Sequence, residues 1–269
     1  AADIVKKFRP DVVIGVGGYA SVRALLAAKQ LGIPYVIHEQ NAFPGLSNKL
    51  LGRWAERIFL SFADSGSGFA RSKTLLTGNP LRPGMETIEG RLPQQGNLLI
   101  FGGSRGAQAI NRTVVEMLPH LKDWPDCPRI LHQTGEDDYD LTRRCYELAG
   151  YDPAQVVPFI DDMGGAYAGA KLVVCRAGAT TLAELTVCGR PAILIPYPHA
   201  AADHQTTNAR TLERAGAARL LPQSELTAEL LARQIRELLN DQDELQRMAD
   251  NGRRLGQPGA AQRILDECR

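Results

Sequence analysis

The chain has 269 residues, of which 44% are hydrophobic and 23% charged, values ordinary for a soluble globular protein. Its formal net charge is only +1, which gives no electrostatic basis for nucleic-acid binding. Five scattered cysteines without a CxxC pair predict free thiols in a reducing cytosol, against disulfides or a zinc site. No apolar run reaches the roughly 18 residues of a membrane span. These features predict a cytosolic protein able to touch a membrane surface.

Short apolar runs alternate with helical patterns, which predicts an α/β protein with parallel sheets. In a first array, strands are expected at 11–16, 35–38, 57–61 and 74–77, with helices at 21–31 and 45–53. In a second array, strands are expected at 97–101, 129–133, 155–158, 171–175, 191–195 and 217–221. The proline- and glycine-rich segment 81–96 between them reads as a linker.

Four regions follow from this pattern. Residues 1–80 form a first lobe, 81–96 the linker, 97–242 a second lobe, and 243–269 helices that are expected to return toward the first lobe. Thr227 is the expected N-cap of a helix with an apolar stripe of Leu231, Ile235, Leu238 and Leu239. The chain opens on the end of an amphipathic helix and the first lobe has few strands, so we expect that lobe to be incomplete.

Glycine-rich turns follow three of the predicted strands, at 15–19, 102–106 and 176–179. Open parallel sheets bind ligands at the carboxyl ends of their strands, where free N–H groups at helix starts attract phosphate. None of the turns matches the dinucleotide fingerprint, and none carries a Walker lysine. NAD binding and ATP-driven chemistry are therefore disfavoured.

The segment 171–209 is the most informative. Its loop leads into a helix that carries Glu184, a carboxylate suited to accept two ribose hydroxyls, while Gln205 and Asn208 offer amides suited to sugar hydroxyls. We interpret the segment as a nucleotide-sugar site that needs no metal. Asp138 and Asp140 imitate a metal-binding DxD motif, but they open a helix, where acidic residues favour the helix dipole.

Other polar residues keep two interpretations. The end of a buried strand carries the polar residues His38, Glu39 and Asn41. They are interpreted either as site residues or as the hydrogen-bonded start of a loop. Arg82 can reach a diphosphate or remain a solvated linker residue. A basic stripe around Trp54 consists of Lys49, Arg53 and Arg57. It is interpreted either as a solvated face or as a contact for anionic lipid headgroups.

Seven motifs occur in an order that resembles the MurG family of bacterial glycosyltransferases: GGY, HEQN, TGNPLR, FGGSRGAQAIN, FIDDM, CRAGATTLAE and DHQTTNA. The resemblance covers residues 10 to 265. It implies the GT-B fold, two Rossmann-like lobes facing across a cleft, without metal or cofactor. It also implies a hexosyltransferase of peptidoglycan synthesis, cell shape and cell division. The implied reaction is inverting transfer of N-acetylglucosamine from UDP-N-acetylglucosamine to lipid I, which yields lipid II.

The resemblance also implies roles for individual residues. Donor contacts fall on the Ile160 backbone for uracil, Glu184 for ribose, Ser104 for diphosphate and Gln205 for the sugar. The helix start beneath the phosphates comprises Ala179, Thr180, Thr181, Leu182 and Ala183. Asn41 and Arg82 reach the donor from the first lobe. The acceptor side takes Gly17, Gly18 and Tyr19, together with His38 and Glu39, which are also the candidate catalytic residues.

One departure from the family is large. The family opens with a GGTGGH loop whose histidine is a candidate general base, and nothing in this chain matches it, so we expect weak or no transfer from this chain. Implied partners are UDP-N-acetylglucosamine, lipid I, an anionic membrane surface and other cell-wall enzymes, at the cytoplasmic face of the membrane. The alternatives are another GT-B enzyme acting on a UDP-sugar, either a glycolipid transferase or an epimerase, and a non-catalytic nucleotide-sugar-binding fragment.

Overall fold

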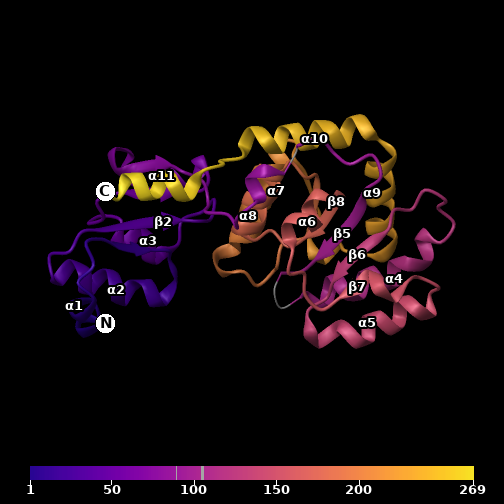
Figure 1. The fold of residues 1–269 in the computed structure, drawn as a ribbon, viewed down its shortest axis with the longest axis horizontal. Helices are drawn as coiled ribbons and strands as arrows, with labels where there is room; N and C mark the ends of the chain where they lie inside the picture. The colour runs from indigo at the N-terminus through magenta and orange to yellow at the C-terminus, as the bar shows by residue number, and fades with distance from the viewer. Residues whose placement is uncertain (89, 104–105) are drawn as a thin grey trace.

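The computed structural model describes residues 1–88, 90–103 and 106–269, and it has two α/β lobes arranged along its long axis (Figure 1). The strands are β1 Val13–Gly15, β2 Tyr35–Glu39, β3 Ile58–Leu60, β4 Thr74–Leu76, β5 Asn97–Phe101, β6 Ile130–Gln133, β7 Val156–Val157, β8 Ala170–Cys175, β9 Ala192–Leu194 and β10 Ala218–Leu220. The helices are α1 Ala2–Phe8, α2 Gly18–Gln30, α3 Leu46–Leu51, α4 Gln108–Leu121, α5 Glu136–Leu148, α6 Met163–Ala168, α7 Ala179–Cys188, α8 His204–Arg214, α9 Ala228–Asn240, α10 Gln242–Leu255 and α11 Ala260–Glu267. All ten predicted strands are confirmed, with ends that differ by at most two residues.

The first lobe is built on a four-stranded parallel sheet in the order β1-β2-β3-β4. Successive side chains of a strand point to opposite faces, so Val36 and Ile37 serve two different layers. Ile37 lies in the cluster that α2 and α3 cover, with Leu25 and Leu51. Val36 lies in a second cluster with Ile264 of α11. The sheet is therefore covered on both faces, and one cover comes from the far end of the chain.

The two C-terminal helices belong to different lobes (Figure 1). We expected both to return toward the first lobe, but α10 contacts α7 and α9 of the second lobe. Only α11 crosses over, after the chain breaks the helix at residues 256–259. There Arg57 ion-pairs with Glu267, the two side chains lying 3.5 Å apart. Arg57 is thereby directed toward α11 and is not part of a free basic stripe.

The second lobe has a six-stranded parallel sheet in the order β10-β9-β8-β5-β6-β7. Leu98 and Ile100 lie in the cluster formed with α4, α9 and α10, whereas Leu99 and Phe101 lie in the cluster formed with α6, α7 and α8. This division follows the period-two alternation of a strand buried on both sides. The predicted cap of α9 is confirmed, because Thr227 Oγ1 accepts a 3.2 Å hydrogen bond from the N–H of Leu230.

The order of the second sheet sets the position of the site. From β5 the chain runs outward through β6 and β7, and it then returns to place β8 on the other side of β5. β5 and β8 therefore flank the point where the winding reverses, which is where open α/β sheets bind ligands. The loops after these strands are 102–106 and 176–178. Both had been predicted from sequence as phosphate-binding turns.

Among the described residues, no helix combines the length and the apolar run that crossing a bilayer requires.

Candidate active site

The loop after β8 leads directly into α7, whose N-terminus is open. Gly178 is the N-cap and provides no side-chain cap. The first intrahelical bond runs from the N–H of Leu182 to the carbonyl of Gly178, at 3.0 Å. The N–H groups of residues 179–181 thus come before Leu182, whose N–H is the first donor bonded within the helix. With the helix dipole, these N–H groups can bind an anion.

Not every residue of this predicted helix start can face a ligand. Leu182 is fully buried in the core of the lobe, and its N–H is already bonded. Ala183 lines a cavity of about 300 Å³ between the lobes, together with Asn79 and Gln257. The hydroxyl of Thr180 accepts a hydrogen bond of 3.2 Å from Asn79 of the first lobe. The capacity to bind phosphate therefore rests on the backbone of residues 179–181.

The glycine loop after β5 is described only at its two ends. The predicted diphosphate contact, Ser104, lies outside the described residues. Before it, the carbonyl of Gly103 accepts a hydrogen bond of 3.0 Å from Gln133 Nε2. After it, Gly106 has a positive φ of 74°, and a Cβ there would lie 1.7 Å from the carbonyl oxygen of Thr134. The end of β6 thus holds both ends of the loop, and only glycine fits at residue 106.

Glu184 is a buried carboxylate with one oxygen engaged and one unused. The side chain is 3% exposed. The Tyr167 hydroxyl donates to Oε2 at 3.0 Å, and Nε of Arg82 lies 3.7 Å from Oε1. Oε1 is buried and accepts no hydrogen bond from the part of the chain that the structure describes. Burial raises the pKa of the carboxyl, and Arg82 and Tyr167 oppose that shift. An unpartnered buried acceptor is costly unless a ligand supplies the donor.

Gln205 lies in the first turn of α8, and the two atoms of its side-chain amide have different roles. Its Oε1 accepts from the backbone N–H of Tyr197 at 2.9 Å and of Ala177 at 3.3 Å. Among the described residues, nothing accepts a hydrogen bond from its Nε2. The oxygen holds two loops together, and the nitrogen remains available as a donor to a ligand.

Ile160 lies between β7 and α6 and is 8% exposed, its side chain in the core beneath the loop. Within the described residues no hydrogen bond uses its backbone N–H or carbonyl. The residue can therefore offer a ligand one backbone donor and one acceptor.

On the first-lobe side, Glu39 organises a loop. Its Oε1 accepts from the N–H of Asn41 at 3.0 Å, and its Oε2 accepts from the N–H of Gly45 at 3.0 Å and from Asn48 Nδ2 at 2.8 Å. The side chain is 2% exposed. With three donors already bound, this carboxylate matches the hydrogen-bonded loop start that the sequence left open.

His38 is likewise buried and bonded. Its Nε2 lies 3.0 Å from the carbonyl of Gly78 and 3.3 Å from the hydroxyl of Ser61. A carbonyl only accepts, so Nε2 carries the proton in this contact. Burial lowers the pKa of the ring, against the raising effects of the Gly78 carbonyl and of Glu39. The neutral imidazole links the end of β2 to the residues after β4.

Asn48 joins two of the predicted motifs and was missed at the sequence level. Besides bonding Glu39, its amide lies where a Cβ on Gly17 would be 3.3 Å from Nδ2. Gly17 caps α2 with a φ of 84°, and Gly18 begins that helix. Tyr19 follows on the surface, 77% exposed, with the Arg23 guanidinium 5.1 Å from its ring centre. A polar side chain within the expected helix 45–53 was the one available signal for Asn48.

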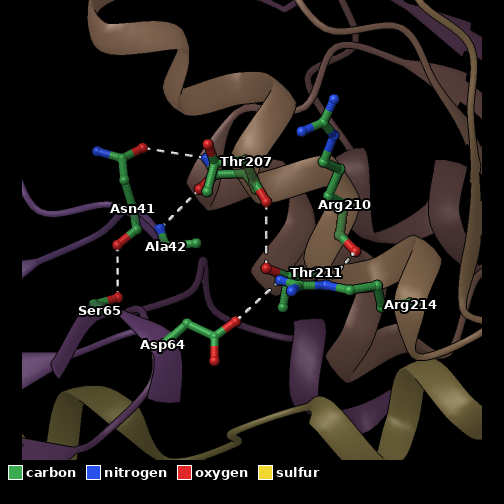
Figure 2. Close-up of polar contacts among 9 residues, drawn as sticks. Asn41, Ala42, Asp64, Ser65, Thr207, Arg210, Thr211 and Arg214 are labelled. Carbon is green, nitrogen blue, oxygen red and sulfur yellow. Dashed lines mark hydrogen bonds and ion pairs between the residues drawn. The ribbon is translucent and has the colours of Figure 1, made fainter. Parts of the chain in front are cut away.

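The lobes meet at α8. Asn41 and Ala42 of the first lobe lie beside this helix (Figure 2), and Asn208 bonds residues of both lobes. Asn208 is fully buried, and both of its amide atoms bond the chain itself, to Ala42, Asn41 and Ala177. The expectation that Asn208 reads sugar hydroxyls is wrong, because no atom of its amide remains free. At the other end of α8, Arg214 ion-pairs with Asp64 at 3.2 Å.

No metal centre of three or more His, Cys, Asp or Glu side chains occurs within residues 1–88, 90–103 and 106–269. Asp138, which imitated a metal motif, accepts a hydrogen bond of 2.7 Å from Asn111 in the first turn of α5.

Two lobes built on parallel sheets, with an open helix N-terminus and a buried carboxylate beside the switch point, are the features of a GT-B glycosyltransferase. The glycosyltransferase family 28 N-terminal domain matches residues 1–60, and the family 28 C-terminal domain matches residues 97–264. The crystal structure of Acinetobacter baumannii MurG superposes with a TM-score of 0.80 at 38% identity, covering 99% of this chain and 76% of that one.

Curated relatives of this chain carry the name of the same enzyme. The chain is 57% identical to the UDP-N-acetylglucosamine--N-acetylmuramyl-(pentapeptide) pyrophosphoryl-undecaprenol N-acetylglucosamine transferase of Syntrophotalea carbinolica, covering 99% of this chain and 74% of the relative. The Geobacter metallireducens enzyme of the same name is 50% identical, with coverage of 98% and 74%. The chain belongs to this MurG family of glycosyltransferases. A putative UDP-N-acetylglucosamine 2-epimerase from Listeria monocytogenes, at 15% identity and a TM-score of 0.72, shares the fold alone.

Proposed function

We propose that this chain transfers N-acetylglucosamine from UDP-N-acetylglucosamine to lipid I, with inversion at the anomeric carbon. One observation carries the proposal. Glu184 holds a buried carboxylate oxygen that accepts no hydrogen bond from the described residues, on the same helix whose open N-terminus begins at Ala179. A nucleoside diphosphate supplies what both features lack, since its ribose hydroxyls can donate to the carboxylate and its phosphates can accept from the helix N–H groups.

The donor then has a defined orientation. Its ribose hydroxyls bond Glu184 Oε1, and its diphosphate lies over the backbone of residues 179–181. The uracil pairs with the backbone of Ile160 beyond the end of β7. The sugar lies toward α8, where the Nε2 of Gln205 donates to its hydroxyls. Arg82 and Asn41 approach from the first lobe.

The chemistry follows from this orientation. A hydroxyl of the acceptor sugar attacks the anomeric carbon and gives its proton to a general base on the acceptor side. The bond to the diphosphate breaks on the opposite face, and UDP leaves with the bonding electrons. Negative charge grows on the diphosphate, where the N-terminus of α7 and the Arg82 guanidinium stabilise it. Removing one such preorganised donor commonly lowers turnover about 100- to 1,000-fold.

The acceptor side belongs to the first lobe, around Gly17, Gly18 and Tyr19. We assign Glu39 the shaping of this side, because its carboxylate already accepts three hydrogen bonds. His38 is the candidate general base, because its Nε2 donates to Gly78 and the lone pair on its Nδ1 is used by none of the described residues. A general base must have a free lone pair within reach of the proton that it removes.

We further propose that the first lobe contacts an anionic membrane surface peripherally, at the cytoplasmic face. Helix α3 and its flanks expose apolar side chains: Leu46 is 85% exposed, Leu50 55% and Phe43 45%. The Lys49 ammonium lies 4.1 Å from the centre of the Phe43 ring, and Arg53 is exposed nearby. Apolar side chains bordered by cations favour the interface of anionic lipids.

Two measurements test the transferase proposal. Calorimetry with UDP-N-acetylglucosamine in EDTA should detect binding, and magnesium should not be needed. Transfer of radiolabelled N-acetylglucosamine to a lipid I analogue should then yield a labelled lipid product, which the radiolabel makes detectable even where transfer is weak.

Binding without transfer would favour a nucleotide-sugar-binding protein. Conversion of the donor to its 2-epimer, observed by proton NMR, would favour an epimerase. Binding only after magnesium is restored would contradict the donor orientation described above.

A further inference from the structure

Asn208 of α8 bonds both lobes through a single buried side chain, and its first-lobe partners Asn41 and Ala42 are drawn in Figure 2. Its Oδ1 accepts a hydrogen bond of 2.8 Å from the N–H of Ala42 in the first lobe. Its Nδ2 donates to the carbonyl of Ala177 in the second lobe at 3.3 Å, and to Oδ1 of Asn41 at 3.2 Å. The side chain is fully buried, so water does not compete for these bonds.

The two backbone partners determine which way the Asn208 amide faces. The N–H of Ala42 can only donate, so the atom facing it must be the oxygen of Asn208. The carbonyl of Ala177 can only accept, so the atom facing it must be the nitrogen. Both conditions agree, and the orientation therefore follows from backbone chemistry instead of an assumption about the amide.

The orientation of Asn41 follows from that of Asn208. Since Asn208 presents a nitrogen, Asn41 must present its oxygen. The backbone of Asn41 is held independently, its N–H by Glu39 Oε1 at 3.0 Å and its carbonyl by the Ser65 hydroxyl at 2.7 Å. The remaining group is the Nδ2 of Asn41, which points away from Asn208 (Figure 2). Among the described residues nothing accepts a hydrogen bond from it.

The same side chain reaches the phosphate loop. Ala177 immediately precedes Gly178, the N-cap of α7, and its N–H donates to Gln205 on the first turn of α8. One helix thus holds both backbone groups of Ala177, through Gln205 and Asn208. The loop after β2 and the loop after β8 are kept in register by Asn208.

We propose that Asn208 is a positioning residue that sets the amide orientation of Asn41, so that Asn41 presents an N–H donor, and never its oxygen, to the donor substrate. The inference rests on the proposed function, in which Asn41 approaches UDP-N-acetylglucosamine from the first lobe. Asn208 itself touches no substrate, since all of its polar atoms are bonded to the chain.

Substitution of Asn208 by Asp replaces the nitrogen that donates to Asn41 Oδ1 with an oxygen, so the hydrogen bond to Asn41 can form only in the opposite direction. The carboxylate can still accept from the N–H of Ala42, but its second oxygen faces the Ala177 carbonyl and the Asn41 oxygen. Asn41 then relieves the repulsion by turning its nitrogen toward the carboxylate. We expect Asn208→Asp to weaken UDP-N-acetylglucosamine binding about tenfold, which is the loss of one hydrogen bond left unsatisfied. Asn208→Ala, which adds no buried charge, should weaken it less.

A double-mutant cycle separates this role from a general loss of structure. In an Asn41→Ala background, Asn208→Asp should weaken donor binding clearly less than in the wild-type background, because no amide remains to be oriented. The loss that persists reports the broken bond to the Ala177 carbonyl. Arg214→Gln is the matched control: it removes another interlobe contact of α8, between side chains 68% and 59% exposed, and should leave donor affinity unchanged. An equal loss in both backgrounds would overturn the inference.

A second readout needs no donor, and it separates failure of this inference from failure of the proposed function. In ¹⁵N NMR spectra of the free protein, the side-chain amide protons of Asn41 should exchange rapidly with water. In Asn208→Asp they should become protected, because they now bond the introduced carboxylate. Unchanged exchange in that variant would contradict the inference even if donor binding is normal. The expected exchange pattern in a protein that binds no donor would contradict the proposed function alone.

Discussion

The hydroxyl of Tyr167 donates a 3.0 Å hydrogen bond to Oε2 of Glu184, and both side chains are buried. An ionised carboxylate has no proton to donate, so the phenol is the donor in this pair. Oε2 of Glu184 is thereby engaged, while Oε1 accepts no hydrogen bond from the described residues. Burial is the main reason that the pKa of Tyr167 is raised well above its usual range, which keeps the phenol protonated as a donor. Tyr167 thereby turns Glu184 so that Oε1 is the atom left for a ligand.

Replacing Glu184 by Gln should weaken UDP binding by about 1.5–3 kcal/mol, because a charged acceptor for ribose hydroxyls becomes a neutral one. Calorimetric titration of wild type and Glu184→Gln with UDP measures the difference. Uracil is the control ligand, because it lacks the ribose. It should bind more weakly than UDP, and with the same affinity for wild type and Glu184→Gln. Equal affinity for UDP would contradict the ribose assignment.

The same substitution should change stability in a pH-dependent way. Burial raises the folded-state pKa of Glu184 above its unfolded value, so the folded chain retains a proton that the unfolded chain releases. The stability contributed by this group is present below the unfolded pKa and is lost as pH rises through the folded pKa. Glu184→Gln should therefore melt at a higher temperature than wild type at pH 8. The advantage should disappear at pH 4. Parallel melting curves across that range would show that the carboxylate titrates normally.

A substitution of Gln205 can separate the role of its Oε1 from the role of its Nε2. Gln205→Glu keeps an oxygen to accept from the N–H groups of Tyr197 and Ala177, and it loses the Nε2 donors. We expect UDP to bind within about twofold of wild type. UDP-N-acetylglucosamine should lose about 1–2 kcal/mol, the value of a hydrogen bond to the sugar. Competition binding with the two ligands gives the ratio, and equal losses would assign Gln205 to the nucleotide.

Two glycines near the phosphate loops should differ in how far substitution by alanine lowers stability. Gly106→Ala forces a Cβ to within 1.7 Å of the Thr134 carbonyl at a positive φ, so we expect a loss of more than about 1 kcal/mol in the free energy of unfolding. Gly178→Ala meets only the Thr181 hydroxyl, at 3.8 Å, and its φ of −68° suits any residue. Its stability should stay within about 0.5 kcal/mol of wild type. Urea unfolding of both variants makes the comparison.

Membrane contact should depend on the exposed leucines of α3. The double variant Leu46→Ser and Leu50→Ser should lower co-sedimentation with anionic vesicles at least about tenfold, since each buried leucine contributes about 1.5–3 kcal/mol. Leu148→Ser is the control, because Leu148 is 82% exposed on α5 of the other lobe. Equal effects of the two changes would indicate non-specific adhesion, and retention by neutral vesicles would argue against the cationic contribution.

Most of the architecture was determined by local sequence. The alternation of Leu98 to Phe101 specifies a strand buried on both faces, and Thr227 followed by an apolar stripe specifies the start and the inner face of α9. These signals act between neighbours along the chain, so a single sequence carries them in full. The glycine turns were also readable, because positive φ angles and close approach restrict those positions to glycine.

The partners of the polar residues were decided only by tertiary structure. Glu184 was recognisable, but Tyr167, which orients it, carries no mark of that role in its own helix. Asn208 looked like a ligand amide, yet it is bonded to Asn41, which lies 167 positions earlier in the chain. Glu39 looked like a chemical group, but Asn48 and two backbone N–H groups already bind it. Residue type shows which hydrogen bonds a side chain can make, whereas the fold decides which are already made and which remain for a ligand.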